Sequence, residues 1–241
     1  MFFDIFQKKY ESNTTVVTDF YSDKDIVSYY NQEPDYSDEL LFYLNNLDRE
    51  KKTLEIGAGN GRILIPLLER GIDIYGIEPS QEMLSKIISN DIRKRILNIT
   101  LQDFIKNEKP IYDQIIIPAT SISLFSPCDI RNFLTQYVQN MSLTNLKLVF
   151  DFLDSESLKT KNGKIYKFKD NDKKIYSANY IQDNKIYNNI YINNGINEKL
   201  GVSVKYIYDD NIVKDILEGF NFKLIKTRDQ DIIRLVITLQ K

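Results

Sequence analysis

The stretch TLEIGAGNGR, residues 53–62, places three alternating glycines directly behind a short apolar run. The chain has 241 residues and nine glycines, so three glycines within five positions are conspicuous. Glycine adopts positive φ at little steric cost, and its missing side chain lets a ligand or another segment approach the backbone closely. A strand, a glycine loop and a following helix therefore predict a binding loop whose free N–H groups face an anionic or polar group.

Strands and helices alternate on both sides of this loop, through residues 53–154. The predicted strands are KTLEIGA, DIYGIEP, NITLQDF, YDQIIIPAT and LKLVFDFLD. The predicted helices are SDELLFYLNNL, GRILIPLLERG, SQEMLSKIISNDIRKRI and SPCDIRNFLTQYVQNMS. The strands are largely apolar rather than alternating, which predicts an α/β fold with a parallel sheet covered on both faces.

The pattern changes at about residue 163. Alternating runs rich in tyrosine and isoleucine, separated by turns that contain Asp, Asn and Gly, continue to residue 208 and predict an antiparallel meander. A helix over DDNIVKDILEGF and a final hairpin over FKLIKTRDQDIIRLVITLQ follow. We therefore expect a small β insertion within a parallel α/β core.

The composition excludes several kinds of site. The chain has no histidine, which excludes a His base, a Ser-His-Asp triad and a His-ligated metal. The single cysteine, Cys128, excludes an internal disulfide and a metal site built from cysteines. A net charge of −2 does not favour nucleic acid or an anionic membrane, and the longest apolar stretches have strand length. We expect a cytoplasmic protein with no metal, no nucleic-acid partner and no membrane partner.

The spacing of the glycines and of the acidic residues after them narrows the class of ligand. A dinucleotide site has the pattern G-x-G-x-x-G, and here Arg62 stands at the third glycine's position. Glu78 ends the next predicted strand, 17 residues beyond Gly61, where a carboxylate can accept both hydrogens of a ribose diol. Asp103, at the end of the third predicted strand, can accept from an adenine amino group, with Phe104 nearby. The alternatives are a helix cap for Glu78 and an ordinary strand-end acid for Asp103.

Four motifs in order, LEIGAGNGR, GIEPSQEML, LQDF and IIIPATSISLF, resemble the class I S-adenosylmethionine-dependent methyltransferases, in particular the small-molecule and natural-product N-methyltransferase type. The resemblance covers most of residues 36–241. It implies a Rossmann-like, mostly parallel sheet with an antiparallel C-terminal hairpin, residues 1–50 as an N-terminal helical lid, and residues 51–241 as the cofactor-binding domain with a β insertion at about 160–208. MSLTNLK replaces the usual Pro-Gly-Gly turn before the fifth strand.

The resemblance implies S-adenosyl-L-methionine as cofactor and S-adenosyl-L-homocysteine as product. The glycines would lie under the methionine part of the cofactor, Glu78 at the ribose, and Asp103 and Phe104 at the adenine. The full set of expected cofactor-binding residues is Glu55, Gly57, Gly59, Gly61, Glu78, Pro79, Met83, Asp103, Phe104 and Pro118.

The acceptor end is expected where open α/β sheets place ligands, at the carboxyl ends of the strands. Asp151 and Asp154, at the end of the fifth predicted strand, are candidate catalytic acids that could take a proton, although a turn cap is an equal interpretation of Asp154. The resemblance adds Tyr29 as a catalytic candidate. The candidate substrate-binding residues are Tyr21, Tyr30, Tyr36 and Ser121, with packing as the alternative for each tyrosine.

The sequence therefore predicts a methyltransferase that acts on a small molecule or short-peptide natural product, at an amine nitrogen. The alternatives are O-methylation of a hydroxyl or carboxyl acceptor, and a non-catalytic partner protein that retains the cofactor fold. The tetrapeptide PATS stands where base-amino methyltransferases carry Asn- or Asp-Pro-Pro-aromatic, which disfavours nucleic-acid methylation. We expect a monomer or homodimer, with the Tyr-rich insertion lining either the pocket or a dimer contact.

Overall fold

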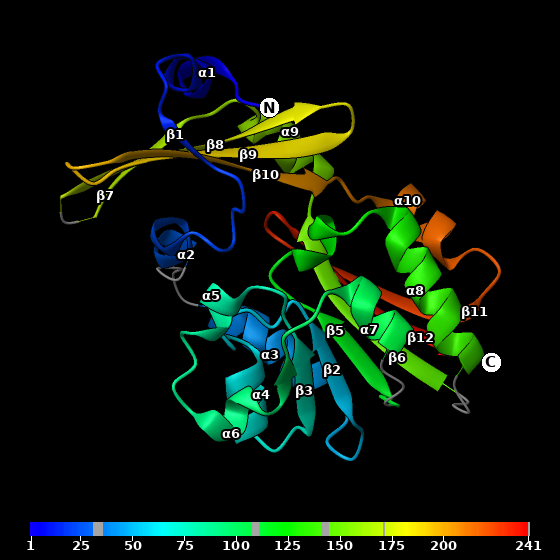
Figure 1. The fold of residues 1–241 in the computed structure, drawn as a ribbon. Coiled ribbons are helices and arrows are strands. Elements are labelled where there is room, and N and C mark those ends of the chain that lie inside the picture. Colours follow the sequence, from blue (N-terminus) through cyan, green and yellow to red (C-terminus); the bar gives the residue numbers. More distant parts are fainter. Residues whose placement is uncertain (31–35, 108–110, 141–144, 171, 241) are drawn as a thin grey trace. The chain divides into compact units, whose positions relative to one another are not determined.

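The computed structural model describes residues 1–30, 36–107, 111–140, 145–170 and 172–240, apart from the side chains at 30 and 140 (Figure 1). The chain divides into two compact units. Unit 1 consists of Met1–Glu33 and Ser155–Ile207, and unit 2 of Pro34–Asp154 and Tyr208–Lys241. The first unit thus joins the N-terminal segment to the β insertion, and its boundary after Glu33 differs from the boundary expected at residue 50.

Unit 2 is built on a sheet whose described strands have the order β11-β12-β6-β5-β2-β3-β4. The strands are β2 (Thr53–Ile56), β3 (Ile74–Ile77), β4 (Ile96–Leu97), β5 (Gln114–Ile117), β6 (Asn145–Leu153), β11 (Asn221–Asp229) and β12 (Ile232–Gln240). Along the run β4-β3-β2-β5-β6 of this sheet, each strand pairs in parallel with the next. Strand β12 is antiparallel to both β6 and β11. This arrangement confirms the predicted Rossmann-like sheet with an antiparallel C-terminal hairpin.

Helices connect these strands. They are α3 (Ser37–Asn46), α4 (Leu64–Glu69), α5 (Gln81–Leu84), α6 (Asn90–Arg93), α7 (Leu101–Asn107), the 3-10 helix η1 (Ser121–Leu124), α8 (Pro127–Asn140) and α10 (Asp210–Leu217). The single helix expected after β3 is wrong. Two separate serine caps divide it: the Ser80 hydroxyl accepts from the N–H of Met83 to start α5, and the Ser89 hydroxyl accepts from the N–H of Ile92 to start α6.

The third predicted strand is also shorter than expected. Strand β4 ends at Leu97, and LQDF lies in helix α7. The reason is a reciprocal cap at the helix start: the Thr100 hydroxyl donates to Asp103 Oδ2 at 2.7 Å and accepts from the N–H of Asp103 at 3.1 Å. This local pairing favours a helix over a longer strand at these residues.

The ligand-binding end of the sheet follows from its topology. The chain passes from β2 outward to β3 on one side, and later from β5 to β6 on the other, so β2 and β5 flank the point where the strand order reverses. Both strands are buried along their whole length. Open α/β sheets bind ligands at the carboxyl ends of the strands at such a point.

Unit 1 is a second sheet, with the order β1-β10-β9-β8-β7 in its described strands. Its elements are α1 (Asp4–Glu11), β1 (Thr15–Val17), α2 (Lys24–Tyr30), α9 (Ser155–Lys161), β7 (Tyr166–Asp170), β8 (Lys173–Gln182), β9 (Lys185–Asn193) and β10 (Glu198–Tyr206). Strands β7 to β10 form the antiparallel meander predicted for the insertion. Strand β1 adds to it in parallel beside β10, a pairing that its three residues gave no means of predicting.

Helices α1 and α2 cover opposite faces of this sheet (Figure 1). Phe6 of α1 packs with Tyr191, whereas Ile26 of α2 packs with Ile190 and Ile192. Successive strand residues point to opposite faces, so alternate residues of β9 serve the two helices. Gly201 contributes to the α2 face, because a Cβ there would lie 2.7 Å from Ile26 Cδ1.

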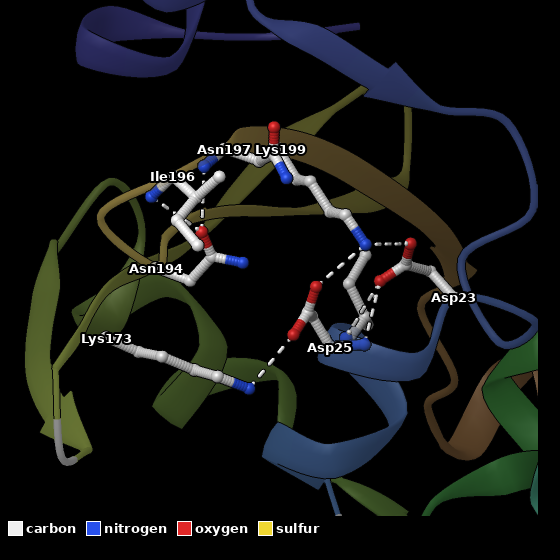
Figure 2. Close-up of polar contacts among 8 residues, drawn as sticks. Asp23, Asp25, Lys173, Asn194, Ile196, Asn197 and Lys199 are labelled. Carbon is white, nitrogen blue, oxygen red and sulfur yellow. Dashed lines mark hydrogen bonds and ion pairs between the residues drawn. The ribbon is translucent and has the colours of Figure 1, made fainter.

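Ion pairs fix the start of α2 to the same sheet (Figure 2). The Lys199 ammonium lies 2.8 Å from Asp23 Oδ2 and 2.7 Å from Asp25 Oδ2, and the Lys173 ammonium lies 2.9 Å from Asp25 Oδ1. The bond from Lys199 is the main cause that lowers the pKa of Asp25. The helix is therefore tied to β8 and β10 both by packing and by charge.

Candidate functional site

The glycine loop follows β2, and its backbone is left-handed at all three glycines: φ is +77° at Gly57, +56° at Gly59 and +81° at Gly61. Such angles strain any residue with a side chain. Two of the glycines are also closely approached by the protein itself. A Cβ at Gly59 would lie 3.1 Å from Met83 Cε, and one at Gly61 would lie 2.7 Å from Ile65 Cδ1. The alternating glycines thus serve both the shape of the loop and its packing.

Glu78, directly after β3, holds this loop in place. Its side chain is 7 % exposed. Its Oε2 accepts from the N–H of Gly59 at 2.9 Å, and its Oε1 accepts from the N–H of Ser80 at 2.8 Å. Burial raises the pKa of the Glu78 carboxyl, and these two N–H groups act in the opposite direction. Each oxygen keeps a second lone pair, so the carboxylate can also accept from the hydroxyls of a ribose diol.

Asn98 supports the same corner and was not predicted. Its amide donates to the carbonyl oxygens of Glu78 and Pro79, both at 2.9 Å. Pro79 itself is exposed beside the loop, and Met83 is half-buried. A lone Asn after a short strand carries no sequence signal for this contact.

Glu55 lies in β2 immediately below the loop and is 2 % exposed. Burial raises the pKa of the Glu55 carboxyl well above its usual range, Arg62 lowers it, and Glu39 and Glu78 raise it further. Its Oε2 atom has no hydrogen-bond partner among the described residues. A buried polar atom without a partner is costly, so this oxygen is suited to a donor supplied by a ligand.

Glu39 on α3 joins the glycine loop to the segment after β5. Its Oε2 is 2.7 Å from Arg62 Nη1, and its Oε1 accepts from the N–H of Ala119 at 2.7 Å. The Arg62 guanidinium also lies 5.1 Å from the centre of the Tyr36 ring, a cation–π distance. Tyr36, predicted to bind substrate, thus packs on the loop's arginine, whereas Glu39 was missed because a helix acid carries no distinguishing pattern.

The segment after β5 forms a tight turn over residues 118–121. The N–H of Ser121 donates to the Pro118 carbonyl at 3.0 Å, and the two central residues have left-handed backbones, with φ of +58° at Ala119 and +55° at Thr120. The N–H of Thr120 donates to Asp151 Oδ1 at 2.5 Å. This turn borders the glycine loop, because a Cβ at Gly57 would lie 3.5 Å from Ser121 Cβ. The predicted residues Pro118 and Ser121 therefore lie beside the loop.

Asp151 is buried on β6 at 2 % exposure, rather than open to solvent as a base would be. Its Oδ2 accepts from the Tyr43 hydroxyl at 2.5 Å while Oδ1 accepts from Thr120. Burial, followed by the charge of Glu39, raises the pKa of Asp151 to about 7. Both oxygens are therefore engaged in holding neighbouring segments, and a direct catalytic role for Asp151 stays a prediction.

Asp154 is also engaged. Its Oδ2 lies 2.9 Å from Arg228 Nη2, and its backbone N–H donates to the Asp231 carbonyl at 2.7 Å. These contacts tie the end of β6 to the β11–β12 hairpin. These contacts favour the interpretation that Asp154 caps a turn. Its role as a proton acceptor stays a prediction.

Two predicted adenine contacts lie elsewhere than expected. Asp103 is exposed in the first turn of α7 and is bonded to Thr100. Phe104 is 2 % exposed, with its ring centroid 6.4 Å from that of Tyr112. Phe104 thus packs in the core of this structure, and the adenine contacts of Asp103 and Phe104 stay predictions.

Tyr21 and Tyr29 belong to unit 1, whereas the glycine loop belongs to unit 2. The Tyr21 hydroxyl lies 3.5 Å from Ser203 Oγ, and the Tyr29 ring centroid lies 5.6 Å from that of Phe168. The side chain of Tyr30 lies outside the described residues. Both described tyrosines thus pack within their own unit, and their role at the substrate stays a prediction.

Within the described ranges, no group of three or more His, Cys, Asp or Glu side chains is placed to hold a metal ion. None of the helices in the described part of the chain has the length and apolar character of a membrane span.

Comparisons with known proteins agree with this geometry. Residues 29–154 match the family model described as a methyltransferase domain. No curated protein matches the chain by sequence.

Three solved structures are similar over nearly the whole chain. The CcbJ methyltransferase from Streptomyces caelestis has a TM-score of 0.71 and 15 % identity, covering 92 % of this chain and 98 % of that one. The sugar N-methyltransferase KedS8 from a Streptoalloteichus species has a TM-score of 0.70 and 14 % identity, covering 95 % and 97 %. The amino pentose methyltransferase CalS10 from Micromonospora echinaspora has a TM-score of 0.65 and 13 % identity, covering 100 % and 98 %.

The family match spans more than half of the chain, so the protein belongs to the methyltransferase-domain family. It is an enzyme of the S-adenosylmethionine-dependent class I type, with S-adenosylmethionine as its cofactor, as the four motifs predicted.

Proposed function

We propose that this methyltransferase transfers a methyl group to an amine nitrogen of a small-molecule or short-peptide natural product. The observation that carries the proposal is the extent of the structural likeness. The sugar N-methyltransferase matches 95 % of this chain, and the amino pentose methyltransferase matches all of it, so the likeness includes the insertion as well as the central sheet. A glycopeptide N-methyltransferase is also similar, at a TM-score of 0.56.

The residues of unit 2 fit the cofactor. The glycine loop has a left-handed backbone, and Glu78 offers carboxylate lone pairs beside it. The buried Glu55 Oε2 has no hydrogen-bond partner among the described residues, so it can accept from a donor such as an ammonium group. The expected contacts follow from these features: the loop for the amino-acid tail, Glu78 for the ribose. S-adenosylmethionine, when bound, supplies an electrophilic methyl group on a sulfonium.

The protein's own chemistry favours nitrogen as the acceptor. An amine that arrives neutral needs no strong base, and water or a nearby carboxylate can take its proton afterwards. A hydroxyl acceptor needs a base, and the chain has no histidine. The carboxylates of Glu39, Glu78 and Asp151 around the two loops already accept backbone N–H bonds. Positioning of the acceptor therefore supplies much of the catalysis.

The cofactor contacts are tested by binding. We expect S-adenosylhomocysteine, and not NAD, to raise the melting temperature. Glu78→Ala should weaken S-adenosylhomocysteine binding more than tenfold in titration calorimetry, because it removes a charged acceptor together with the support of Gly59. Glu82→Ala is the matched control: Glu82 of α5 pairs with Lys86 at 3.2 Å, and the variant should bind the product normally. Stabilisation by NAD alone would refute the proposed cofactor site.

The acceptor is tested with matched pairs. Amino sugars and the corresponding hydroxy sugars are incubated with S-adenosylmethionine carrying a labelled methyl group, together with short peptides with free and blocked N-termini. We expect label on the amines alone. Methylation of the hydroxy member of a pair would replace the proposal with O-methylation.

A further inference from the structure

The turn after β5 has a backbone that its residues do not favour. Ala119 and Thr120 both have left-handed φ, and the closing bond from Ser121 to Pro118 makes a turn of the type I′ family. Such turns strongly prefer Asn and Gly at these two positions. A β-branched residue such as Thr120 at positive φ is an outlier. Something beyond the local sequence must hold this turn.

Two carboxylates from separate elements hold it. Glu39 of α3 accepts from the N–H of Ala119 at 2.7 Å, and Asp151 of β6 accepts from the N–H of Thr120 at 2.5 Å. Each strained residue thus has its own acceptor. Bonds from backbone N–H groups to carboxylates are charge-assisted and stronger than neutral ones.

The two carboxylates are themselves fixed. Glu39 is held by Arg62 of the glycine loop at 2.7 Å, and Asp151 by the Tyr43 hydroxyl at 2.5 Å. The charged and titratable groups that face Asp151 are Tyr43 and Glu39 from α3 and Arg234 from β12. Tyr43 is completely buried. The acceptors therefore have little freedom to move away from the turn.

The turn at residues 118–121 also borders the glycine loop. Ser121, its last residue, is the side chain that a Cβ at Gly57 would approach at 3.5 Å. Arg62 and Glu39 join the same two loops by a second route. The conformation at residues 119 and 120 thus fixes the position of the turn, residues 118–121, which forms one wall beside the glycine loop.

We propose that Glu39 and Asp151 are positioning residues, whose carboxylates impose the left-handed turn at Ala119 and Thr120 and so place the wall beside the glycine loop for cofactor and acceptor. The proposal deepens the proposed function and rests on the methyl-transfer site at that loop. It assigns Asp151 a role through the backbone of Thr120 instead of direct contact with the acceptor.

The test removes a carboxylate and then supplies the turn by another means. Glu39→Ala should weaken S-adenosylhomocysteine binding about tenfold and lower kcat/KM by at least as much, since a charge-assisted bond to the turn is lost. Adding Ala119→Gly should restore most of both values, because glycine adopts the left-handed backbone without an acceptor. Asp151→Ala and Asp151→Ala with Thr120→Gly form the second pair. Glu39→Gln keeps one acceptor oxygen for the N–H of Ala119 but loses the ion pair with Arg62, so it should retain more of both values than Glu39→Ala does.

Gln230→Gly is the matched control for the rescue. Gln230 is an exposed residue with φ of +50° in the β11–β12 turn, so glycine there relieves a similar strain away from the site. Added to Glu39→Ala, it should not restore binding or kcat/KM. Recovery by this distant glycine, or unchanged binding and turnover in Glu39→Ala, would overturn the positioning role.

Failure of the proposed function looks different. A parent protein that binds no S-adenosylhomocysteine would refute the site at the glycine loop itself. The Asp151 variants change a buried residue and could fail to fold. The Glu39 side chain is 17 % exposed, so the Glu39 series still decides the proposal in that case.

Discussion

Two loops lie side by side at the carboxyl ends of β2 and β5, and they reach left-handed backbones by different means. The loop after β2 uses glycine at each of its three positive-φ positions. The turn after β5 uses Ala119 and Thr120, which are held by Glu39 and Asp151. In the first loop the residue type supplies the conformation, and in the second the tertiary structure does.

The difference decides what a sequence can reveal. A glycine pattern is local, so it is visible within five residues. The acceptors of the second turn lie 80 and 31 positions away along the chain. PATS therefore gives no local sign that its backbone is constrained, although both loops flank the same binding edge. A turn can thus be as well defined as a glycine loop and still leave no motif in the sequence.

Gly61→Ala should have the largest effect on stability. A side chain there meets both the left-handed φ of +81° and the Ile65 side chain at 2.7 Å, which together cost about 3 kcal/mol of unfolding free energy. Gly71→Ala is the control, because its φ is +85° and no atom lies within 4 Å of a Cβ built there. Urea unfolding should show a loss of about 1–2 kcal/mol for that variant. Equal losses of stability in the two variants would show that the close approach of Ile65 to Gly61 adds nothing to the cost of a side chain there.

The pH dependence of stability should report the burial of Asp151. Burial raises the pKa of Asp151 from its ordinary 3.8 to about 7, so the folded protein binds a proton between these values that the unfolded chain has released. Stability from this group is thus fully present below pH 4 and is lost as pH rises toward 7. It should fall by about 2 kcal/mol between pH 5 and pH 7.

Unfolding by urea across this pH range provides the measurement. The raised pKa values of Glu55 and Glu78 give the same sign, so Asp151→Asn should reduce the slope without abolishing it. A slope of unchanged size in Asp151→Asn would mean that Asp151 ionises in the folded protein as it does in the unfolded chain.

Thr120→Gly should have the smallest effect and the opposite sign. Relief of a left-handed β-branched residue is worth about 1–2 kcal/mol, and the added flexibility of glycine in the unfolded chain offsets about 0.5–1 kcal/mol of it. A net gain of roughly 0.5–1 kcal/mol is therefore expected in thermal or urea unfolding. Gly57→Ala, at φ of +77° in the neighbouring loop, should lose stability instead. Loss of stability in both variants would mean that Thr120 is not strained.

The predictable parts of the fold are those encoded over short distances. The glycine loop, the apolar strands β2, β3, β5 and β6 and the alternating insertion strands carry their own periodicity, and the structure contains them. The sequence also placed Glu78 at the end of β3. The interpretation that it caps the next segment is supported by the N–H of Ser80, and the ribose contact remains to be tested.

The errors arise where side chains compete with these patterns. The Thr100 and Asp103 cap converts an expected strand into α7, and the Ser80 and Ser89 caps divide an expected helix in two. No local pattern indicates that residues 1–33 pack with β8 to β10, because these partners lie far along the chain. Glu39 and Asn98 were missed for the same reason, since single polar residues on a helix or after a strand have no periodicity to read.

The strand order has a consequence for synthesis on the ribosome. Strand β6 pairs with β12, which is made only after the whole insertion and α10 have been translated. Until then β6 presents an unpaired edge, the kind of surface that recruits other extended chains. Unit 1 can meanwhile complete its own sheet, because β10 pairs with β1, which is synthesised much earlier. The insertion therefore delays closure of the catalytic sheet, and aggregation or chaperone binding should be greatest in nascent chains that end between β10 and β12.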